Sequence, residues 1–342
     1  MHNLKKLIFL YLCLVSTCCF AKLTQDEEHA KTEGIILYNQ YKVAAPQLLI
    51  AANAGDSEAQ FYLGNEIRNS KKYITPEAIK WYTASADQGN YYAMFQLSRL
   101  DSDLCKITKT CNSDNRTASD WFKTLIDTLK PLADKGDGDA MAVLYNTTGK
   151  IEWLERSAEA NSPQGQWMLA NLYQDGKGTF FIPGSREKAV NELLKSASEN
   201  GNSKAMLRYF GELRAQKSLL EARRWLEQAA ETGYANAVYN YGYFLAVEPD
   251  ALGFKRDLIK GYALISTLKT LNGGGNMQQD VNDTIPEITS QMTSEQISEG
   301  KLVAEKWEAS HPALSFFQIN SLIDLHSCNI NPAKLKECVR FY

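Results

Sequence analysis

One pattern of small and large apolar residues returns six times along the chain. Each copy has Ala or Ser, a Gly or Asn three residues later, a small residue after four more and a large apolar residue after a further four. Residues four apart share one face of an α-helix, and Gly or Asn between two such faces suits a left-handed turn. Each copy therefore predicts two helices joined by a tight turn. The six turn residues are Gly55, Gly89, Gly136, Asn161, Gly201 and Gly233.

The spacing of the copies predicts a solenoid. Successive turn residues lie 34, 47, 25, 40 and 32 residues apart, and periods of this size are typical of helix pairs that stack on copies of themselves. Period-two alternation is almost absent, so the predicted fold class is all-α. The solenoid is expected to span residues 46–271. The spaces between its helix pairs would be filled by Trp81, Trp121, Trp153 and Trp225.

The pattern changes after the repeats. Residues 272–276 (Asn-Gly-Gly-Gly-Asn) form a flexible connection by composition. Thr293 and Gln296 then form a capping-box arrangement, which predicts a helix that ends before Pro312. The apolar residues of this helix would cover the exposed core of the last repeat. Two end pieces are therefore expected, an opening helix within residues 22–45 and a C-terminal helical cap at residues 277–342.

The first 21 residues have the pattern of a secretory signal peptide. Lys5 and Lys6 precede a short apolar run, and the segment ends on the small residue Ala21. The run is too short to span a bilayer, so we expect residues 1–21 to direct export and to be cleaved near Ala21. The alternative is a lipid anchor on Cys18, because the preceding residues resemble a lipobox. No second long apolar segment occurs, so no membrane-spanning segment is expected.

Cysteine spacing predicts two local disulfides. Four cysteines remain after residue 21, an even number that favours disulfides in an exported protein. The expected pairs are Cys105 with Cys111 and Cys328 with Cys338, which close short loops. Four free buried thiols are the alternative. A zinc site is disfavoured, because these spacings fit no known ligand pattern.

Charge and motifs argue against nucleic acid binding and against catalysis. Without residues 1–21, which hold two lysines and no acid, the chain has 35 basic and 40 acidic residues, a net charge of −5. His311 and His326 belong to no visible acid–base or metal set, and nucleophile-elbow and phosphate-loop motifs are lacking. Asp137 and Asp139 suggest a helix N-terminus rather than a cation site. We therefore expect no catalytic, metal or cofactor site.

A binding surface is expected on the concave side of the array. Positions four and eight residues after each turn residue face the core, so positions three, six and ten share a neighbouring stripe. This stripe is rich in Tyr, Trp and Arg, which dominate binding energy at protein interfaces. Packing between helices is the alternative for Phe95 and Trp167. The nine candidates for partner binding are Tyr92, Phe95, Arg99, Gln164, Trp167, Asn171, Asn236, Tyr239 and Tyr243.

The repeats resemble a known family. Trp225–Gly242 (WLEQAAETGYANAVYNYG) and Trp81–Ser98 are the segments most similar to the Sel-1-like repeat, a relative of the tetratricopeptide repeat. The resemblance covers roughly residues 45 to 270. It implies a right-handed α-solenoid of Sel-1-like helix pairs that binds other proteins in the bacterial periplasm.

Three further segments resemble one branch of that family, the periplasmic immunity proteins that accompany phospholipase D effectors of the type VI secretion system. These segments are Tyr73–Tyr82 (YITPEAIKWY), Gly149–Ser157 (GKIEWLERS) and His311–Phe317 (HPALSFF). The resemblance implies a protein that binds a toxic phospholipase and occludes its active site. One alternative is a periplasmic regulatory or envelope-assembly scaffold. The other is a β-lactam-binding or β-lactam-hydrolysing enzyme, although such Sel-1-like proteins carry a disulfide in every repeat.

Overall fold

The computed structural model describes residues 23–111, 116–271 and 275–317. The proposed cleavage site, Cys18 and the Cys328–Cys338 pair lie outside these residues. Within them all the longer secondary-structure elements are helices, and the fold is an all-α solenoid, as predicted. The α-helices are α1 (Gln25–Asn39), α2 (Ala45–Asn53), α3 (Ser57–Lys71), α4 (Pro76–Ala86), α5 (Tyr91–Leu97), α6 (Cys105–Thr108), α7 (Ala118–Asp134), α8 (Gly138–Thr148), α9 (Ile151–Glu159), α10 (Pro163–Gln174), α11 (Ser185–Glu199), α12 (Ser203–Ala215), α13 (Leu219–Glu231), α14 (Ala235–Ala246), α15 (Leu258–Thr267), α16 (Met277–Thr289) and α17 (Ser294–Ser310). Short 3-10 turns lie at η1 (Leu100–Ser102), η2 (Pro249–Ala251) and η3 (Leu268–Thr270).

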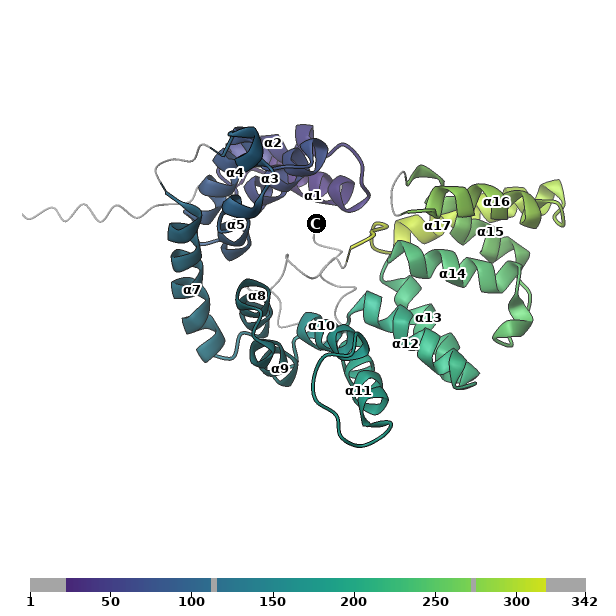
Figure 1. Ribbon diagram of the computed structural model, residues 1–342. Coiled ribbons are helices and arrows are strands. Elements are labelled where there is room, and N and C mark those ends of the chain that lie inside the picture. The colour runs from purple at the N-terminus through teal and green to yellow at the C-terminus, as the bar shows by residue number, and fades with distance from the viewer. Residues whose placement is uncertain (1–22, 112–115, 272–274, 318–342) are drawn as a thin grey trace, which may run out of the picture.

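The six predicted tight turns are confirmed. Each predicted turn residue has a positive φ, between 59° at Asn161 and 97° at Gly55. The turns join an outer helix to the inner helix that follows it, as in α2–α3, α4–α5 and α9–α10 (Figure 1). In the first five copies the residue after the turn caps the inner helix with its side chain. These capping residues are Asp56, Asn90, Asp137, Ser162 and Asn202.

Buried polar side chains connect one copy to the next at the turns. Gln60 Nε2 donates to Ala52 O at 3.1 Å, and Gln88 of the following copy donates to Gln60 Oε1 at 2.8 Å. The same arrangement returns further along, where Gln166 Nε2 donates to Ala158 O and Asn200 donates to Gln166 Oε1. These bonds satisfy carbonyls at the ends of outer helices, which an uncapped helix would leave unpaired.

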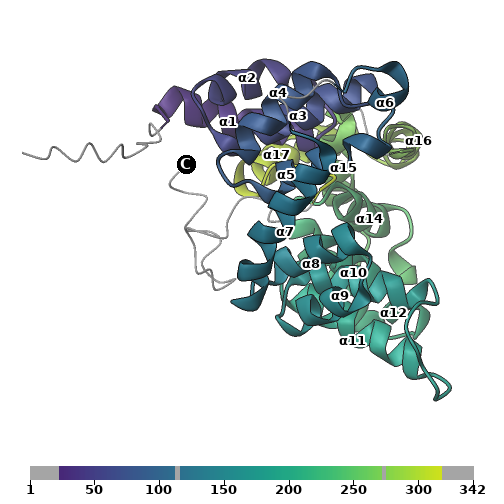
Figure 2. The same cartoon turned by 60° about the vertical axis from the view of Figure 1, so that its left-hand side comes forward.

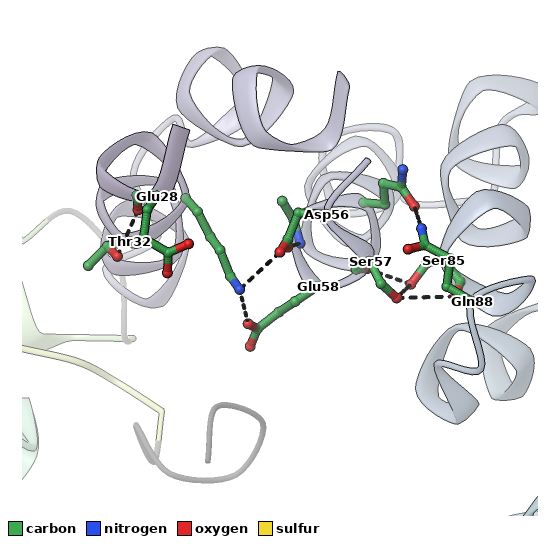
Figure 3. Close-up of polar contacts among 10 residues, drawn as sticks. Glu28, Thr32, Asp56, Ser57, Glu58, Ser85 and Gln88 are labelled. Atoms are coloured by element: carbon green, nitrogen blue, oxygen red, sulfur yellow. Dashed lines mark hydrogen bonds and ion pairs between the residues drawn. The ribbon is translucent and has the colours of Figure 1, made fainter. Parts of the chain in front are cut away.

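An ion cluster attaches the first helix to the solenoid (Figure 3). Lys31 Nζ of α1 lies 3.1 Å from Asp56 Oδ2 and 2.9 Å from Glu58 Oε2 at the start of α3. Burial lowers the pKa of the Lys31 ammonium, but the two carboxylates outweigh burial, so that pKa is raised and the group stays charged. Ser57 and Ser85 join α3 to α4 beside this cluster.

The hydrophobic interior is divided into two large clusters and a small one. One large cluster runs from Ile35 to Leu144, and the other from Ala170 to Phe316. Between them lie only three buried apolar residues, Leu154, Ala158 and Leu169. Around α9 and α10 the interior therefore holds few large buried apolar side chains, and a small residue such as Gly165 lets the helices approach closely. Of the four predicted space-filling tryptophans, Trp81, Trp121 and Trp225 are buried and Trp153 is half-buried.

A C-terminal segment closes the array into a ring. We call residues 311–317 the strap. It leaves the end of α17 and reaches α1, so that the two ends of the solenoid face each other in both views (Figures 1 and 2). Phe316 N donates to Asn39 O at 3.0 Å, and Gln40 Nε2 donates to Leu314 O at 2.9 Å. The rings of Tyr41 and Phe316 lie 5.3 Å apart.

The strap also replaces a missing helix cap. The sixth copy has Tyr234 at the N-cap of α14, and Tyr234 makes no capping bond with its side chain. Instead Ala235 N donates to Ser315 O at 2.9 Å, and Ser315 N donates to Gly233 O at 3.0 Å. Strap backbone lies so close to Gly233 that a Cβ there would meet Pro312 O at 2.8 Å. The uncapped helix end and the glycine therefore form the docking place of the strap.

The described part of the predicted C-terminal cap contains the helices α16 and α17, and residues 311–317 are not helical. The Thr293 capping box forms, and α17 ends at Ser310. Trp307 of α17 is buried, and α17 packs against α15. The ring of His311 stacks on Trp307 with centroids 3.4 Å apart, and its Nε2 lies 3.1 Å from Glu231 Oε2 of α13. His311 thus contributes to the contact between the cap and the solenoid.

The predicted local disulfide between Cys105 and Cys111 is present, with Cα atoms 5.1 Å apart. It closes the insertion between α5 and α7, and Cys105 is fully buried.

Substitution of two helical glycines tests the close approach of α9 and α10. A Cβ at Gly165 would meet Ser157 Oγ at a clashing distance, whereas a Cβ at Gly211 of α12 meets nothing within 4 Å. Gly165→Ala should lower the free energy of unfolding by about 1–3 kcal/mol through overpacking. Gly211→Ala should raise it by about 1 kcal/mol through helix propensity. Urea denaturation of both variants checks this, and equal effects would refute the close approach at Gly165.

The strap is tested by a second glycine pair. Gly201 and Gly233 both have positive φ, but only Gly233 contacts the strap backbone. Both alanine variants should lose about 1–2 kcal/mol from the strained turn. Gly233→Ala should in addition displace the strap and increase the radius of gyration measured by small-angle X-ray scattering. An unchanged scattering profile for the Gly233→Ala variant would contradict the inference that the strap closes the ring.

Candidate functional site

The concave face is the candidate site, and it is formed by the inner helices. These are the helices that follow each tight turn, and α8 and α10 lie nearer the centre of the ring than α9 and α11 (Figure 1). The nine predicted binding residues come from α5 with Arg99 just after it, from α10, and from α14. Arg99 is exposed, and the other eight are half-buried. We describe them as the α5 set, the α10 set and the α14 set.

The α5 set is an aromatic surface built on a neighbouring repeat. The ring of Tyr92 lies 4.5 Å from that of Tyr91 and 6.0 Å from that of Phe61 on α3. Burial raises the pKa of Tyr92 well above its usual range, so its hydroxyl remains a neutral donor. The guanidinium of Arg99 lies 5.3 Å from the centroid of the Phe95 ring. This set offers an exposed cation over an aromatic ring, which suits a polar or anionic partner group.

The α10 set lies beside the strap. Lys204 Nζ of α12 is 5.6 Å from the centroid of Trp167 and 5.7 Å from that of Phe317. Burial lowers the pKa of Lys204. Asn171 Oδ1 accepts a hydrogen bond from Arg208 Nη1 at 2.6 Å. Trp167 and Phe317 of the strap therefore contact the same ammonium group, that of Lys204. The α10 set is thus connected to the segment that closes the ring.

The α14 set is partly covered by the C-terminal cap. Tyr239 and Tyr243 stack with ring centroids 6.1 Å apart. The hydroxyl of Tyr239 lies 2.8 Å from Thr284 Oγ1 of α16, whereas Tyr243 donates to Glu248 Oε1 at 3.2 Å. Asn236 Nδ2 donates to the hydroxyl of Tyr234 at 3.1 Å. Tyr239 thus contributes to the attachment of α16.

The predicted residues lie on three separate stretches of the ring. The residues of each stretch contact neighbouring side chains rather than the other two sets. It adds two features that the sequence analysis did not assign to a site. The first is the strap, whose Phe317 reaches the α10 set. The second is the loop between α10 and α11, where Phe181 and Ile182 are exposed. The only sequence signal for the loop was the apolar run from Phe180 to Ile182 between two glycines.

Of the acidic pair near Gly136, Asp137 caps α8 and Asp139 contacts Ser162, the residue that caps α10. Asp137 Oδ1 accepts from Ala140 N at 2.9 Å, and Asp139 Oδ1 accepts from Ser162 Oγ at 2.8 Å. Across the residues that the structure describes, no group of three or more His, Cys, Asp or Glu side chains is placed to hold a metal ion. In those same stretches no helix has the length and apolar character needed to cross a bilayer.

Comparison with known proteins identifies the repeat. The sequence profile of the Sel1 repeat family matches residues 57–90, 151–162, 163–202 and 205–234, which confirms the predicted resemblance for these segments. The matched segments cover α3–α4 and α9–α13, so Sel1-type repeats make up these parts of the solenoid. No curated protein matches the sequence at a significant level.

Solved structures that are similar to the chain include the following two. One is a protective antigen of uropathogenic Escherichia coli with an SLR fold, at 18% identity and a TM-score of 0.47, with 90% of this chain and 66% of that chain covered. The other is a Sel1 repeat protein from Oxalobacter formigenes, at 20% identity and a TM-score of 0.37, with 75% and 99% covered. The chain thus spans 66% of the length of the E. coli antigen.

The two stacked tyrosines of the α14 set should differ in their effect on stability. Thr284 is buried, so Tyr239→Phe removes a hydrogen bond from a shielded site and should cost about 1 kcal/mol. Tyr243→Phe removes a bond to exposed Glu248 and should cost almost nothing. Thermal denaturation of the two variants gives the comparison. A larger loss for Tyr243→Phe would show that α16 does not depend on the Tyr239 hydroxyl.

Proposed function

We propose that this protein is a periplasmic immunity protein that binds a phospholipase D-type effector of a type VI secretion system and occludes its active site. The observation that carries the proposal is a ring of Sel1-type helix pairs whose inner helices display Tyr, Trp and Arg side chains. The choice of partner rests on the resemblance of Tyr73–Tyr82, Gly149–Ser157 and His311–Phe317 to immunity proteins of that kind.

A pre-formed surface supports tight neutralisation. The strap joins the ends of the array, and the Cys105–Cys111 disulfide fixes the insertion after α5. Little of the surface would then have to be ordered when a partner binds, which reduces the entropic cost of association. Aromatic side chains and arginine on such a surface are the residue types that supply most binding energy.

Export is part of the proposal. Residues 1–21 would be removed near Ala21, which would place the mature chain in the oxidising periplasm where disulfides form and persist. Effectors that attack phospholipids from the periplasm would be met there. Intact mass spectrometry of the periplasmic form distinguishes cleavage after Ala21 from a lipid on Cys18.

Neutralisation can be tested by co-expression. A phospholipase D-type effector directed to the periplasm of E. coli should stop growth, and the full-length protein should restore growth. Arg99→Glu should weaken effector binding by about 10-fold or more, because it reverses the exposed charge of the α5 set. Lys301→Glu, an equivalent reversal at an exposed residue of α17, is the matched control and should leave binding unchanged. Continued killing in the presence of the wild-type protein would refute the proposal.

A further inference from the structure

Two cations lie one turn apart on α12, the inner helix that follows the tight turn at Gly201. Lys204 and Arg208 are four residues apart, so their side chains are neighbours on one face of the helix. Lys204 lies three residues after the turn residue, the position that Tyr92 and Gln164 occupy in their own copies. Lys204 therefore belongs to the predicted binding stripe, in a copy where the sequence analysis named no residue.

The two cations contact the α10 set and the strap. Lys204 Nζ lies 5.6 Å from the ring centroid of Trp167 and 5.7 Å from that of Phe317. Arg208 Nη1 donates to Asn171 Oδ1 at 2.6 Å. Lys204 and Arg208 are both half-buried, so both charges have lost part of their hydration. Side chains from two repeats and from the end of the chain thus converge on one small area.

No carboxylate of the described residues pairs with either cation. The ion pairs there include neither Lys204 nor Arg208, although Glu212 follows one turn further along α12. Burial alone changes the pKa of Lys204, and it lowers that pKa. Lys31 is the contrasting case, because two carboxylates at 3.1 and 2.9 Å raise its pKa despite burial. Lys204 thus bears the cost of burial without the gain of an ion pair.

The charges at equivalent positions limit the kind of anion that these cations can bind. The third residue after the turn is Glu58 in the first copy and Asp139 in the third. A nucleic acid or an anionic bilayer would need basic residues along the whole stripe. The inner helices also line the inside of the ring, which a flat bilayer cannot reach (Figure 1). A single acidic side chain needs only the two cations of α12.

We propose that Lys204 and Arg208 form a subsite on the concave face that binds an acidic side chain of the protein partner. This inference rests on the proposed function, which places the effector against the same face. A carboxylate has two oxygens, so it accepts hydrogen bonds from the ammonium and from a guanidinium N–H that Asn171 does not use. Trp167 and Phe317 reduce the access of water to these bonds, which strengthens them.

Affinity for the phospholipase D-type effector tests the subsite, with protein purified from the periplasm. Lys204→Met keeps the apolar part of the side chain and removes the charge, so Kd should rise by about 30-fold. The Tm of this variant should not fall, because the lost charge has no counter-ion in the free protein. Lys301→Met at an exposed residue of α17 is the matched control and should bind like wild type. Lys31→Met should lower the Tm, because it leaves two carboxylates without their cation.

Carbodiimide coupling tests the chemistry of the partner group. The reagent activates carboxylates, and an activated Asp or Glu of the effector that lies against Lys204 should form an amide with the Lys204 amine. Mass spectrometry of the digested complex should find this linked peptide, and the complex of Lys204→Met should lack it. A complex in which Lys204 is linked to no effector carboxylate would overturn the proposed acidic group.

The outcomes separate this inference from the proposed function. Wild-type affinity of Lys204→Met, or a lower Tm of that variant, would overturn the subsite and leave the immunity function standing. A wild-type protein that does not bind the effector would overturn the immunity function and the subsite with it. Flotation of the wild-type protein with phosphatidylglycerol vesicles, if lost in Lys204→Met, would assign the cations to a lipid phosphate and would also overturn the inference.

Discussion

The left-handed residue at each tight turn is the constraint on which the rest of the structure depends. It reverses the chain within a few residues and places a capping residue directly before the next helix, as at Gly55 and Asp56. The two helices of a pair can then approach closely through alanine and glycine. Repetition of this geometry generates the curvature, and the curvature brings residues that are more than 270 positions apart, such as Gln40 and Leu314, into hydrogen-bonding contact.

In the sixth copy of the repeat, a change at one position allows the strap to close the ring. Tyr234 cannot cap α14 as Asp56 caps α3, so the first amide of α14 is available to Ser315. The same strap then offers Phe316 and Phe317 to α1 and to the α10 set. Stability, ring closure and the shape of the binding surface are therefore linked through a few backbone hydrogen bonds. The candidate site is a property of the closed ring rather than of any single repeat.

The repeated pattern of small and large apolar residues predicted the helix pairs because the interactions behind it are local. Turn residues, caps and four-residue stripes each act within a few positions, so Gly136 with Asp137, or Thr293 with Gln296, could be interpreted without a structure. Long-range contacts could not be predicted from the sequence. Strap docking on Gly233 requires the curvature of the whole array, and the cover that α16 places over Tyr239 depends on the path of the chain after residue 270. The exposure of Phe181 depends on Phe180 turning inward to Arg186, which an apolar run of three residues does not reveal.

The uneven division of the core has a consequence for cooperativity. On one side of the ring the two large apolar clusters are connected through buried Leu154, Ala158 and Leu169 and through partly buried side chains such as Tyr173 and Leu193. On the other side they are connected through the strap. Repeat arrays unfold as one unit only when the coupling between neighbouring units exceeds the difference in their own stabilities. With both connections in place we expect the two halves to unfold in a single transition. Without the strap, the contacts around α9 and α10 alone would have to couple the two halves.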